Sequence, residues 1–266
     1  MKKFQILCVT MGQKNFSKIK EMNIHSDVVF ANQANQVGYE ELKFEGYRAQ
    51  MITTNTCGVG KNRNIALMYA DAEYCLFADD DVVYYDGLAK KVVDEFEKHK
   101  DADVFIFNLD SEDGDRKQVK YDKTRRCKII EKMPWGCVRV AVKLEALKKA
   151  NIWFTTLFGG GCMFPSGEDS LWLTALKRNG LKFYISSETI GRVMFTNSSW
   201  FSGYDKKYYF GKGAFYQAVH PRTFYLWMLY ICFRTRSKSK ISFQKSLSWI
   251  KKGKYSYINN ISYKEL

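Results

Sequence analysis

The sequence predicts an α/β fold in which helices flank a central sheet. Short apolar runs of strand length alternate with segments whose apolar residues recur at helical spacing. One such run, residues 74–78, stops abruptly at three consecutive carboxylates. A strand of successive apolar residues is typical of a buried sheet, and open α/β sheets keep their ligands at the carboxyl ends of their strands.

The first two expected strands, residues 4–10 and 27–31, both end in polar residues. A polar turn follows the first strand, and two amide side chains follow the second. We expect these residues to form a pocket for a base or sugar, and the candidates are Thr10, Gln13, Asn32 and Gln33. Asn and Gln are also common turn residues, which explains the two amides equally well.

A third strand, residues 49–53, precedes a glycine-bearing loop and a helix. In that helix Ile65, Met68, Tyr69 and Ala72 recur at helical spacing. Its first turn carries Lys61 and Arg63, and backbone amides with two cations make a diphosphate contact. A tight turn without a ligand is the alternative.

The acidic triplet itself, Asp79, Asp80 and Asp81, follows the apolar run of residues 74–78. Three neighbouring carboxylates repel one another unless a cation lies among them. Mg²⁺ or Mn²⁺ would offset the repulsion and keep coordination sites for phosphate oxygens. We expect Asp79 and Asp81 to be the metal ligands, and Asp79 and Asp80 to contact the donor. A solvated acidic turn or helix cap is the other interpretation.

Further helices and strands follow the triplet. Asp86 is the expected cap of a helix in which Leu88, Val92 and Phe96 face inward. The remaining elements before residue 151 are strands at residues 103–108, 127–130 and 137–142, a charged loop at residues 111–126 and a helix at residues 144–150.

A second informative stretch joins three glycines, residues 159–161, to the acids Glu168 and Asp169. The glycines suit a mobile loop that closes over a substrate. The acids open a helix with Leu171, Trp172, Ala175 and Leu176 on its inner face. Ser166 and Asp169 have capping-box spacing, so a structural role competes with that of a general base.

Beyond a strand at residues 182–186 the chain becomes aromatic and basic. Residues 201–266 hold thirteen Lys and Arg against two acids, which is +11 of the total charge of +14. Lys212, between two glycines, is a candidate phosphate contact. The aromatic run at residues 224–233 is too short to span a bilayer, but with its basic flank it suits a helix in the headgroup layer of an anionic membrane. A buried helix with a solvated basic flank is the alternative.

The seven cysteines are scattered and often lie inside apolar runs. They indicate reduced core residues in a cytoplasmic protein, and no pair has zinc-site spacing. Residues 1–4 run directly into an expected strand and lack the longer apolar region of a secretion signal, so we do not expect one. We therefore expect a catalytic domain at residues 1–215 and a basic, aromatic extension at residues 216–266, in a protein that lies in the cytoplasm or peripherally on the inner face of the membrane.

Taken together, these motifs resemble the family-two glycosyltransferases of the GT-A fold, above all bacterial enzymes that build surface polysaccharides such as capsule and lipopolysaccharide. The resemblance covers residues 4–213 and rests on the order of the first strand, residues 60–67, residues 73–82 and residues 167–169. It implies a nucleotide-diphosphate sugar donor, a divalent ion on the acidic motif and an inverting displacement. Asp169 would then be the base, and Glu168 would orient the acceptor.

Two departures from the family pattern bear on this assignment. Many relatives have a downstream histidine near the metal, whereas residues 193–196 contain none and His220 lies late in the chain. Asn32 and Gln33 stand where an aspartate is common in the nucleoside pocket. The third metal ligand and the base of the donor therefore stay open.

The leading hypothesis is an inverting glycosyltransferase that uses a UDP-sugar to extend a glycan or lipid-linked acceptor. Its diphosphate leaving group would be stabilised by the metal with help from Lys61, Arg63 or Lys212. A metal-dependent nucleotidyl- or phosphotransferase would use the same acidic cluster. A nucleic-acid-binding protein would use the basic tail but leaves the acids unexplained, so no nucleic-acid partner is expected.

Overall fold

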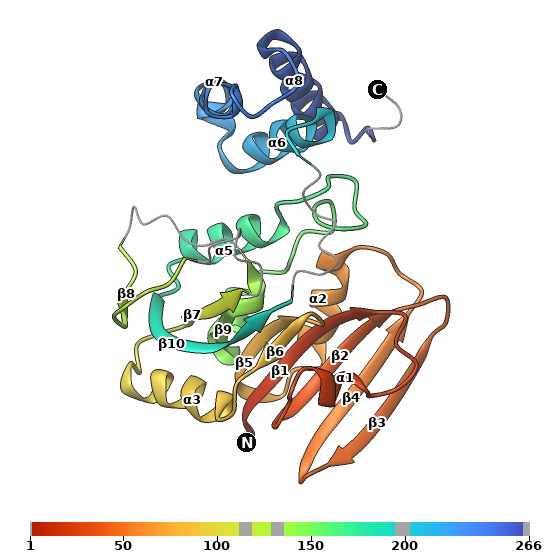
Figure 1. Cartoon of the computed structure of the whole chain (residues 1–266), viewed down its shortest axis with the longest axis vertical. Helices are drawn as coiled ribbons and strands as arrows, with labels where there is room; N and C mark the ends of the chain where they lie inside the picture. Colours follow the sequence, from red (N-terminus) through yellow and green to blue (C-terminus); the bar gives the residue numbers. More distant parts are fainter. Residues whose placement is uncertain (1, 112–118, 129–135, 195–202, 263–266) are drawn as a thin grey trace. The chain divides into compact units, whose positions relative to one another are not determined.

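The computed structural model describes residues 2–111, 119–128, 136–194 and 203–262 (Figure 1). The chain forms two compact units. Unit 1 comprises Met1–Cys57, Lys61–Phe154 and Ala175–Thr196, and unit 2 comprises Gly58–Gly60, Thr155–Thr174 and Asn197–Leu266. The division into a catalytic domain and an extension after residue 215 stays a prediction. Residue 215 lies within a helix.

Unit 1 is built on a mixed sheet. Within the described residues its ten strands have the order β3-β4-β2-β1-β5-β9-β7-β10-β6, and β8 pairs with β10. The strands are β1 Lys2–Met11, β2 Asp27–Gln33, β3 Gly38–Phe44, β4 Tyr47–Thr54, β5 Ala72–Asp79, β6 Val82–Tyr84, β7 Val104–Ser111, β8 Arg125–Arg126, β9 Val140–Lys143 and β10 Phe183–Val193.

The helices include each one that the sequence predicts, most of them with shifted ends. They are α1 Lys18–Glu21, α2 Val59–Met68, α3 Leu88–Lys98, α4 Leu144–Ala150, α5 Glu168–Arg178, α6 Lys206–Val219, α7 Phe224–Thr235 and α8 Phe243–Asn259, with 3-10 turns at Cys137–Arg139 and Pro221–Thr223. The prediction of α4 is confirmed residue for residue. The expected strand at residues 127–130 and the charged loop at residues 111–126 lie partly outside the described residues.

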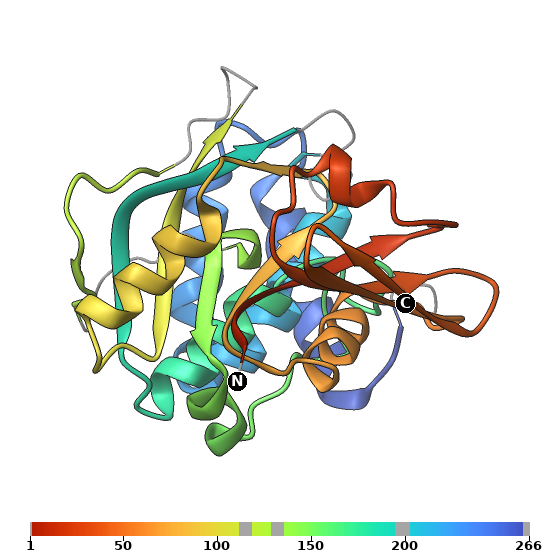
Figure 2. The ribbon, with the colours of Figure 1, turned by 90° about the horizontal axis from the view of Figure 1, so that it is seen from below.

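The centre of the sheet is parallel. Strand β1 pairs in parallel with both β2 and β5, and β2 pairs in parallel with β4. Most residues of β1, β2 and β5 are buried, as the apolar runs predict. Helix α3 packs on β1 and β10, and Figure 2 shows it against one face of the sheet. The α/β architecture expected from the sequence is confirmed.

Asp86 is not the cap of helix α3, and strand β3 was not predicted. Helix α3 begins after Gly87, which occupies the cap position in a left-handed conformation, and Asp86 instead accepts a hydrogen bond from the Asn23 amide at 2.9 Å. Strand β3 was not predicted because nearly all of its side chains are exposed, so charged residues interrupt any apolar alternation. Its partner is β4, to which the Glu45-Gly46 turn connects it.

Unit 2 contains a three-helix cluster, in which α6, α7 and α8 pack on one another (Figure 1). Two glycines permit the close approach of α6 and α8. A Cβ at Gly213 would lie 2.0 Å from the Ile250 carbonyl oxygen, and one at Gly253 would lie 1.9 Å from that of Phe210. Among the described helices, none combines the length and the apolar character needed to cross a bilayer.

Candidate functional site

The carboxyl ends of the central strands carry the polar residues that the sequence singles out. In the register of the sheet, Thr10 on β1 is opposite Asn32 on β2, and Val9 is opposite Asp79 on β5. Strand β2, which follows β1 in the chain, lies on one side of β1, and β5 lies on the other side of β1. This is the switch point at which open α/β sheets bind ligands, so the position predicted for the acidic triplet is confirmed.

The acidic triplet is held by unit 1 from several directions. The Thr10 hydroxyl donates a hydrogen bond to the Asp80 carboxylate, and the Lys18 ammonium donates to the Asp80 backbone carbonyl at 3.3 Å. The backbone N–H of Met194 donates to the Asp81 carbonyl at 2.9 Å. The backbone of the triplet is therefore fixed between β1, α1 and the end of β10.

The surroundings of Asp81 oppose a negative charge on its carboxyl group. Partial loss of water around its carboxyl, followed by the charges of Asp79 and Asp80, raises the pKa of Asp81 to about 6. The ionised form is thus less favoured in the folded protein than in water. A bound cation would reverse that preference, because it attracts the charge that its neighbours repel.

Arg63 neutralises part of the cluster. Its side chain is only 3% exposed, its Nη2 lies 3.0 Å from Oδ1 of Asp79, and its guanidinium lies 5.6 Å from the centre of the Phe154 ring. Of the residues that recur at helical spacing, Met68 and Tyr69 are exposed and Ala72 belongs to β5, whereas Arg63 is buried. The ion pair and the aromatic ring compensate for burial of the charge.

The residues on either side of Arg63 were missed by sequence reasoning. The buried Asn62 amide donates to the carbonyls of Thr10 at 3.2 Å and Ala31 at 2.7 Å, which ties together the ends of β1 and β2. Asn64 exchanges two hydrogen bonds of 2.9 Å with the backbone of Phe154. The sequence signal for this role was the pair of asparagines around an arginine at the start of a helix. The short side chain of asparagine can form hydrogen bonds with backbone groups. Lys61 is exposed on the same turn.

The amides after β2 have unequal surroundings. Asn32 is fully buried, and its side chain accepts from the Gln13 backbone N–H at 3.0 Å and donates to the Gln13 carbonyl at 2.9 Å. It also donates to the Thr53 hydroxyl at 3.1 Å. Gln13 and Gln33 are half-buried beside it. Asn32 therefore fixes the loop after β1, and contacts with a ligand by these residues stay predictions.

The acidic cluster fits a divalent ion that takes its other ligands from a substrate. Among the described residues no group of three or more His, Cys, Asp or Glu side chains is arranged to hold a metal by itself. Mg²⁺ is commonly held by one or two carboxylates together with substrate phosphates. His220, the late histidine, instead stacks on Trp227 with ring centres 4.7 Å apart.

In unit 2, the predicted glycine loop is pinned at its base. Phe158 and Phe164 are buried with ring centres 4.8 Å apart, and the Gly159 N–H donates to the Phe164 carbonyl at 2.9 Å. A Cβ at Gly159 would lie 2.5 Å from Cγ1 of Val59 and 2.9 Å from the carboxyl carbon of Glu168. The turn is thus built around the Glu168 side chain, and only glycine fits there at a φ of 107°.

Glu168 and Asp169 form the first turn of α5, as predicted, and both are half-buried. Trp172 and Leu176 on the expected inner face are buried. Acids at this position favour the helix dipole, so the structural role is present. The role of Asp169 as a general base and that of Glu168 in orienting the acceptor stay predictions.

Lys212 lies in the middle of α6, and the glycines beside it serve helix packing. Gly213 faces α8, and a Cβ at Gly211 would lie 3.1 Å from the Pro165 ring. The Lys212 ammonium lies 5.2 Å from the centre of the Phe215 ring, and burial followed by the charge of Arg234 lowers the pKa of Lys212. No phosphate-binding turn is present at Lys212, so its contact with a phosphate stays a prediction.

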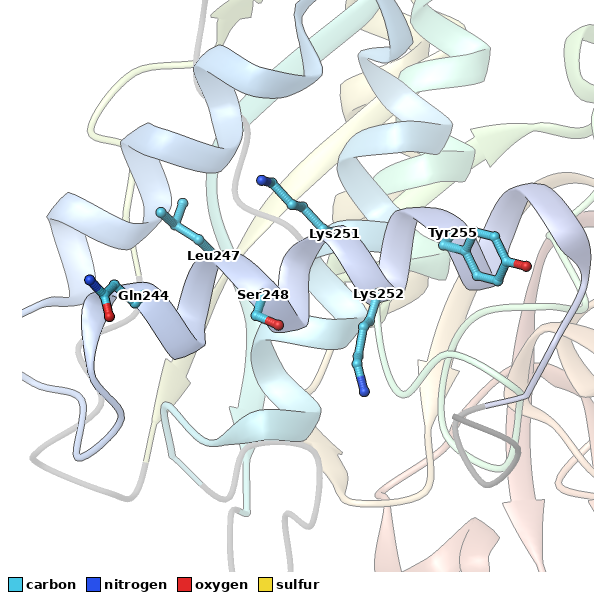
Figure 3. A pocket seen from close by; sticks show the side chains of 6 residues that line it. All are labelled: Gln244, Leu247, Ser248, Lys251, Lys252 and Tyr255. Carbon is cyan, nitrogen blue, oxygen red and sulfur yellow. The ribbon is translucent and has the colours of Figure 1, made fainter.

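A shallow hollow of about 520 Å³ opens on α8 in unit 2. Figure 3 shows its lining side chains along one side of the helix, and these are Gln244, Leu247, Ser248, Lys251, Lys252 and Tyr255. None of the six belongs to the predicted site. The hollow is therefore a separate feature of the helical cluster.

Comparison with solved structures supports the fold. The chain resembles TarS residues 1–349 of S. aureus with a TM-score of 0.60 and 15% identity, over 98% of this chain and 93% of that one. The complex of the same TarS fragment with UDP-GlcNAc gives a TM-score of 0.61 and 15% identity over the same shares. The complex with UDP gives 0.61 and 14%, over 98% of this chain and 83% of that one. The GT-A fold expected from the sequence is confirmed.

Comparison of sequences defines the family. No curated protein sequence matches the chain. The model of the family "Glycosyl transferase family 2" matches residues 38–171, just over half of the chain. That stretch includes α2 with Arg63, the acidic triplet and the first turn of α5. The chain therefore belongs to glycosyl transferase family 2.

Proposed function

We propose that this glycosyltransferase is an inverting, metal-dependent enzyme that takes its sugar from a UDP donor. The observation that carries the proposal is the acidic triplet at the carboxyl end of β5, beside the end of β1, with the pKa of Asp81 raised to about 6. A charge arrangement of this kind suits a cation and a diphosphate. The TarS structures with UDP and UDP-GlcNAc support a nucleotide-sugar donor.

Asp79 and Asp81 would hold Mn²⁺ or Mg²⁺, which when bound neutralises charge on the departing diphosphate. Arg63 lies beside Asp79 and neutralises part of its charge, so that only the remaining part would act on the cation. Asp80 is held by Thr10 and keeps the triplet in register with β1. The exposed Lys61, and Lys212 of unit 2, are the further cations proposed to contact the diphosphate.

The loop after β1 would contact the nucleoside. Asn32 holds the backbone of Gln13 through two hydrogen bonds, so the shape of this loop is fixed before the donor arrives. The polar groups proposed to reach the base or ribose are those of Gln13 and Gln33. Preorganisation of this kind favours binding, because less conformational entropy is lost.

Asp169 is the proposed base. Its carboxylate takes the proton from the acceptor hydroxyl while that oxygen forms a bond to the anomeric carbon of the sugar. The bond between the anomeric carbon and the diphosphate oxygen breaks at the same time, and the diphosphate leaves with the electron pair. Glu168, which is packed against Gly159, would orient the acceptor.

The proposed acceptor is a glycan or a lipid-linked glycan in the synthesis of a surface polysaccharide, with the enzyme in the cytoplasm at the inner face of the membrane. The support is the charge distribution, since residues 201–266 hold +11 of the total +14. A nucleic-acid partner is not proposed, because that alternative gives no role to the acidic triplet or to Glu168 and Asp169.

Donor hydrolysis tests the function. UDP-sugars are incubated with the purified chain and Mn²⁺, and the products are separated. Release of UDP supports sugar transfer, whereas release of pyrophosphate identifies a nucleotidyltransferase. Before that assay, a thermal-shift screen of nucleotide sugars with Mn²⁺ selects the donor, because a ligand of the folded state raises the melting temperature.

A further inference from the structure

Helix α7 is apolar on two opposite faces. Its inner face, which includes Phe224, Met228 and Ile231, is buried in the helical cluster of unit 2. A second set of apolar and aromatic residues lies outside, with exposed fractions between 40% and 68%. This outer stripe consists of Tyr225, Leu226, Leu229, Tyr230 and Phe233.

The spacing of the outer stripe makes it one continuous surface. Its members lie one, three or four positions apart in the sequence, which places them along one side of a helix. A soluble helix usually presents polar residues on that side. Five exposed large side chains on three turns therefore require a partner that removes them from water.

Cations border the outer stripe at both ends. The Lys254 ammonium lies 4.6 Å from the centre of the Tyr225 ring. At the other end, Arg234 donates a hydrogen bond to the Tyr230 hydroxyl at 3.2 Å. Arg236 and Phe233 together line a hollow of about 360 Å³ with Ser242, Phe243 and Gln244.

The basic surface continues from that hollow onto α8. Gln244 also lines the hollow of Figure 3, where Lys251 and Lys252 stand beside Tyr255. The ammonium of Lys252 lies 4.8 Å from the centre of the Trp249 ring, which is a cation–π contact. An apolar strip thus adjoins a row of cations within a single unit.

The charge of this segment selects among the partners that an apolar surface can have. Residues 206–262 contain no Asp and no Glu. A second copy of the chain would bring this basic surface against itself, and like charges would oppose that contact. Nucleic acid would match the cations but not the exposed side chains of Leu226 and Leu229. An anionic lipid surface matches both.

We propose that the outer stripe of α7 inserts into the boundary between headgroups and acyl chains of an anionic bilayer, while Arg236, Lys251, Lys252 and Lys254 contact lipid phosphates. This deepens the proposed function, on which it rests for the place of the acceptor. Tyr225 and Tyr230 suit that boundary, because a tyrosine side chain has an apolar ring and a polar hydroxyl.

Vesicle co-sedimentation of the full chain tests the inference. Vesicles of phosphatidylcholine alone are compared with an equimolar mixture of phosphatidylcholine and phosphatidylglycerol. The chain is expected to pellet with the mixed vesicles and to be released as the salt concentration rises, because salt screens the headgroup charge. A chain that stays in the supernatant with mixed vesicles at low salt overturns the proposal.

Two paired variants locate the surface. Leu226→Ser combined with Leu229→Ser removes apolar area and is expected to weaken partitioning by roughly tenfold or more. Its control is Val37→Ser combined with Met68→Ser, since those side chains of unit 1 are 77% and 62% exposed. Arg236→Glu combined with Lys251→Glu tests the charges, and its control is the exposed pair Lys148→Glu and Lys149→Glu on α4.

The outcomes separate the alternatives. Loss of pelleting in both test pairs but in neither control, at unchanged melting temperature, supports the lipid surface. If the leucine pair pellets like the unchanged chain, or if it only converts a dimer to a monomer, the surface serves another purpose and the proposal is wrong. Donor hydrolysis is measured on the same variants without vesicles. Absence of hydrolysis together with intact pelleting would count against the proposed function alone.

Discussion

Nη2 of Arg63 and Oδ1 of Asp79 lie 3.0 Å apart, joining the first turn of α2 to the carboxyl end of β5. The arginine is buried, whereas the side chain of Asp79 is 38% exposed. One end of the pair thus belongs to the core and the other to the acidic cluster. This relationship links the stability of unit 1 to the chemistry of its site.

Arg63→Met should lower the free energy of unfolding by about 2 kcal/mol, which is below the usual cost for a fully buried pair because water screens Asp79. Chemical denaturation measures the change. Combining it with Asp79→Asn should restore part of the loss, since no carboxylate is then left without its partner. Additive losses in the double variant would show that the two side chains do not interact.

Asp81→Asn should abolish Mn²⁺-dependent binding of the donor, measured by calorimetry. In the absence of metal it should stabilise the protein at about pH 8 and leave stability unchanged at about pH 4 or below. The folded-state pKa of Asp81 is raised to about 6, so the stability of the unchanged chain falls as pH rises from its ordinary value of 3.8 toward 6. A melting temperature that responds equally at both pH values would contradict this account of the cluster.

Asp169→Asn should reduce sugar transfer by roughly 10²- to 10⁴-fold, the usual contribution of a general base, and leave donor binding intact. Product formation is followed by chromatography, and donor affinity is measured separately. Glu168→Gln serves as the comparison, with a smaller loss. Transfer at the normal rate by the Asp169→Asn protein would remove Asp169 from the mechanism.

Gly159→Ala should displace the Glu168 carboxylate, because the added methyl would lie 2.9 Å from its carboxyl carbon and 2.5 Å from Val59. We expect a fall in transfer rate and a cost in stability of about 1–3 kcal/mol from the strained backbone. Gly160→Ala is a matched control, since a Cβ there meets no atom within 4 Å and Gly160 has no positive φ. Equal effects of the two substitutions would argue against a role for the close contact.

Gly213→Ala should separate α6 from α8, because its methyl would lie 2.0 Å from the Ile250 carbonyl oxygen. The expected result is a loss of about 1–3 kcal/mol in stability, seen by thermal denaturation. Gly38→Ala is the control, as a Cβ there has open space. A Gly213→Ala protein as stable as the control would show that the two helices can move apart without cost.

The tertiary structure gives packing partners to two residues that the sequence marks as unusual. Arg63, a predicted diphosphate contact, is buried beside Asp79 and Phe154, and its contact with a diphosphate stays a prediction. Lys212, a candidate phosphate contact between two glycines, lies within α6, where its neighbour Gly213 allows α6 and α8 to touch. In each case the residue type limits the chemistry, but the partner comes from a distant part of the chain.

The sequence by itself determined the α/β alternation and the place of the acidic triplet at the end of a strand. Both follow from local patterns, since apolar runs and their interruptions are set by neighbouring residues. Only the tertiary structure decided that Thr10, Asn62 and Arg63 converge on the ends of β1, β2 and β5, and that α7 keeps an apolar face exposed. Those facts depend on packing between segments far apart in the chain, which local periodicity does not specify.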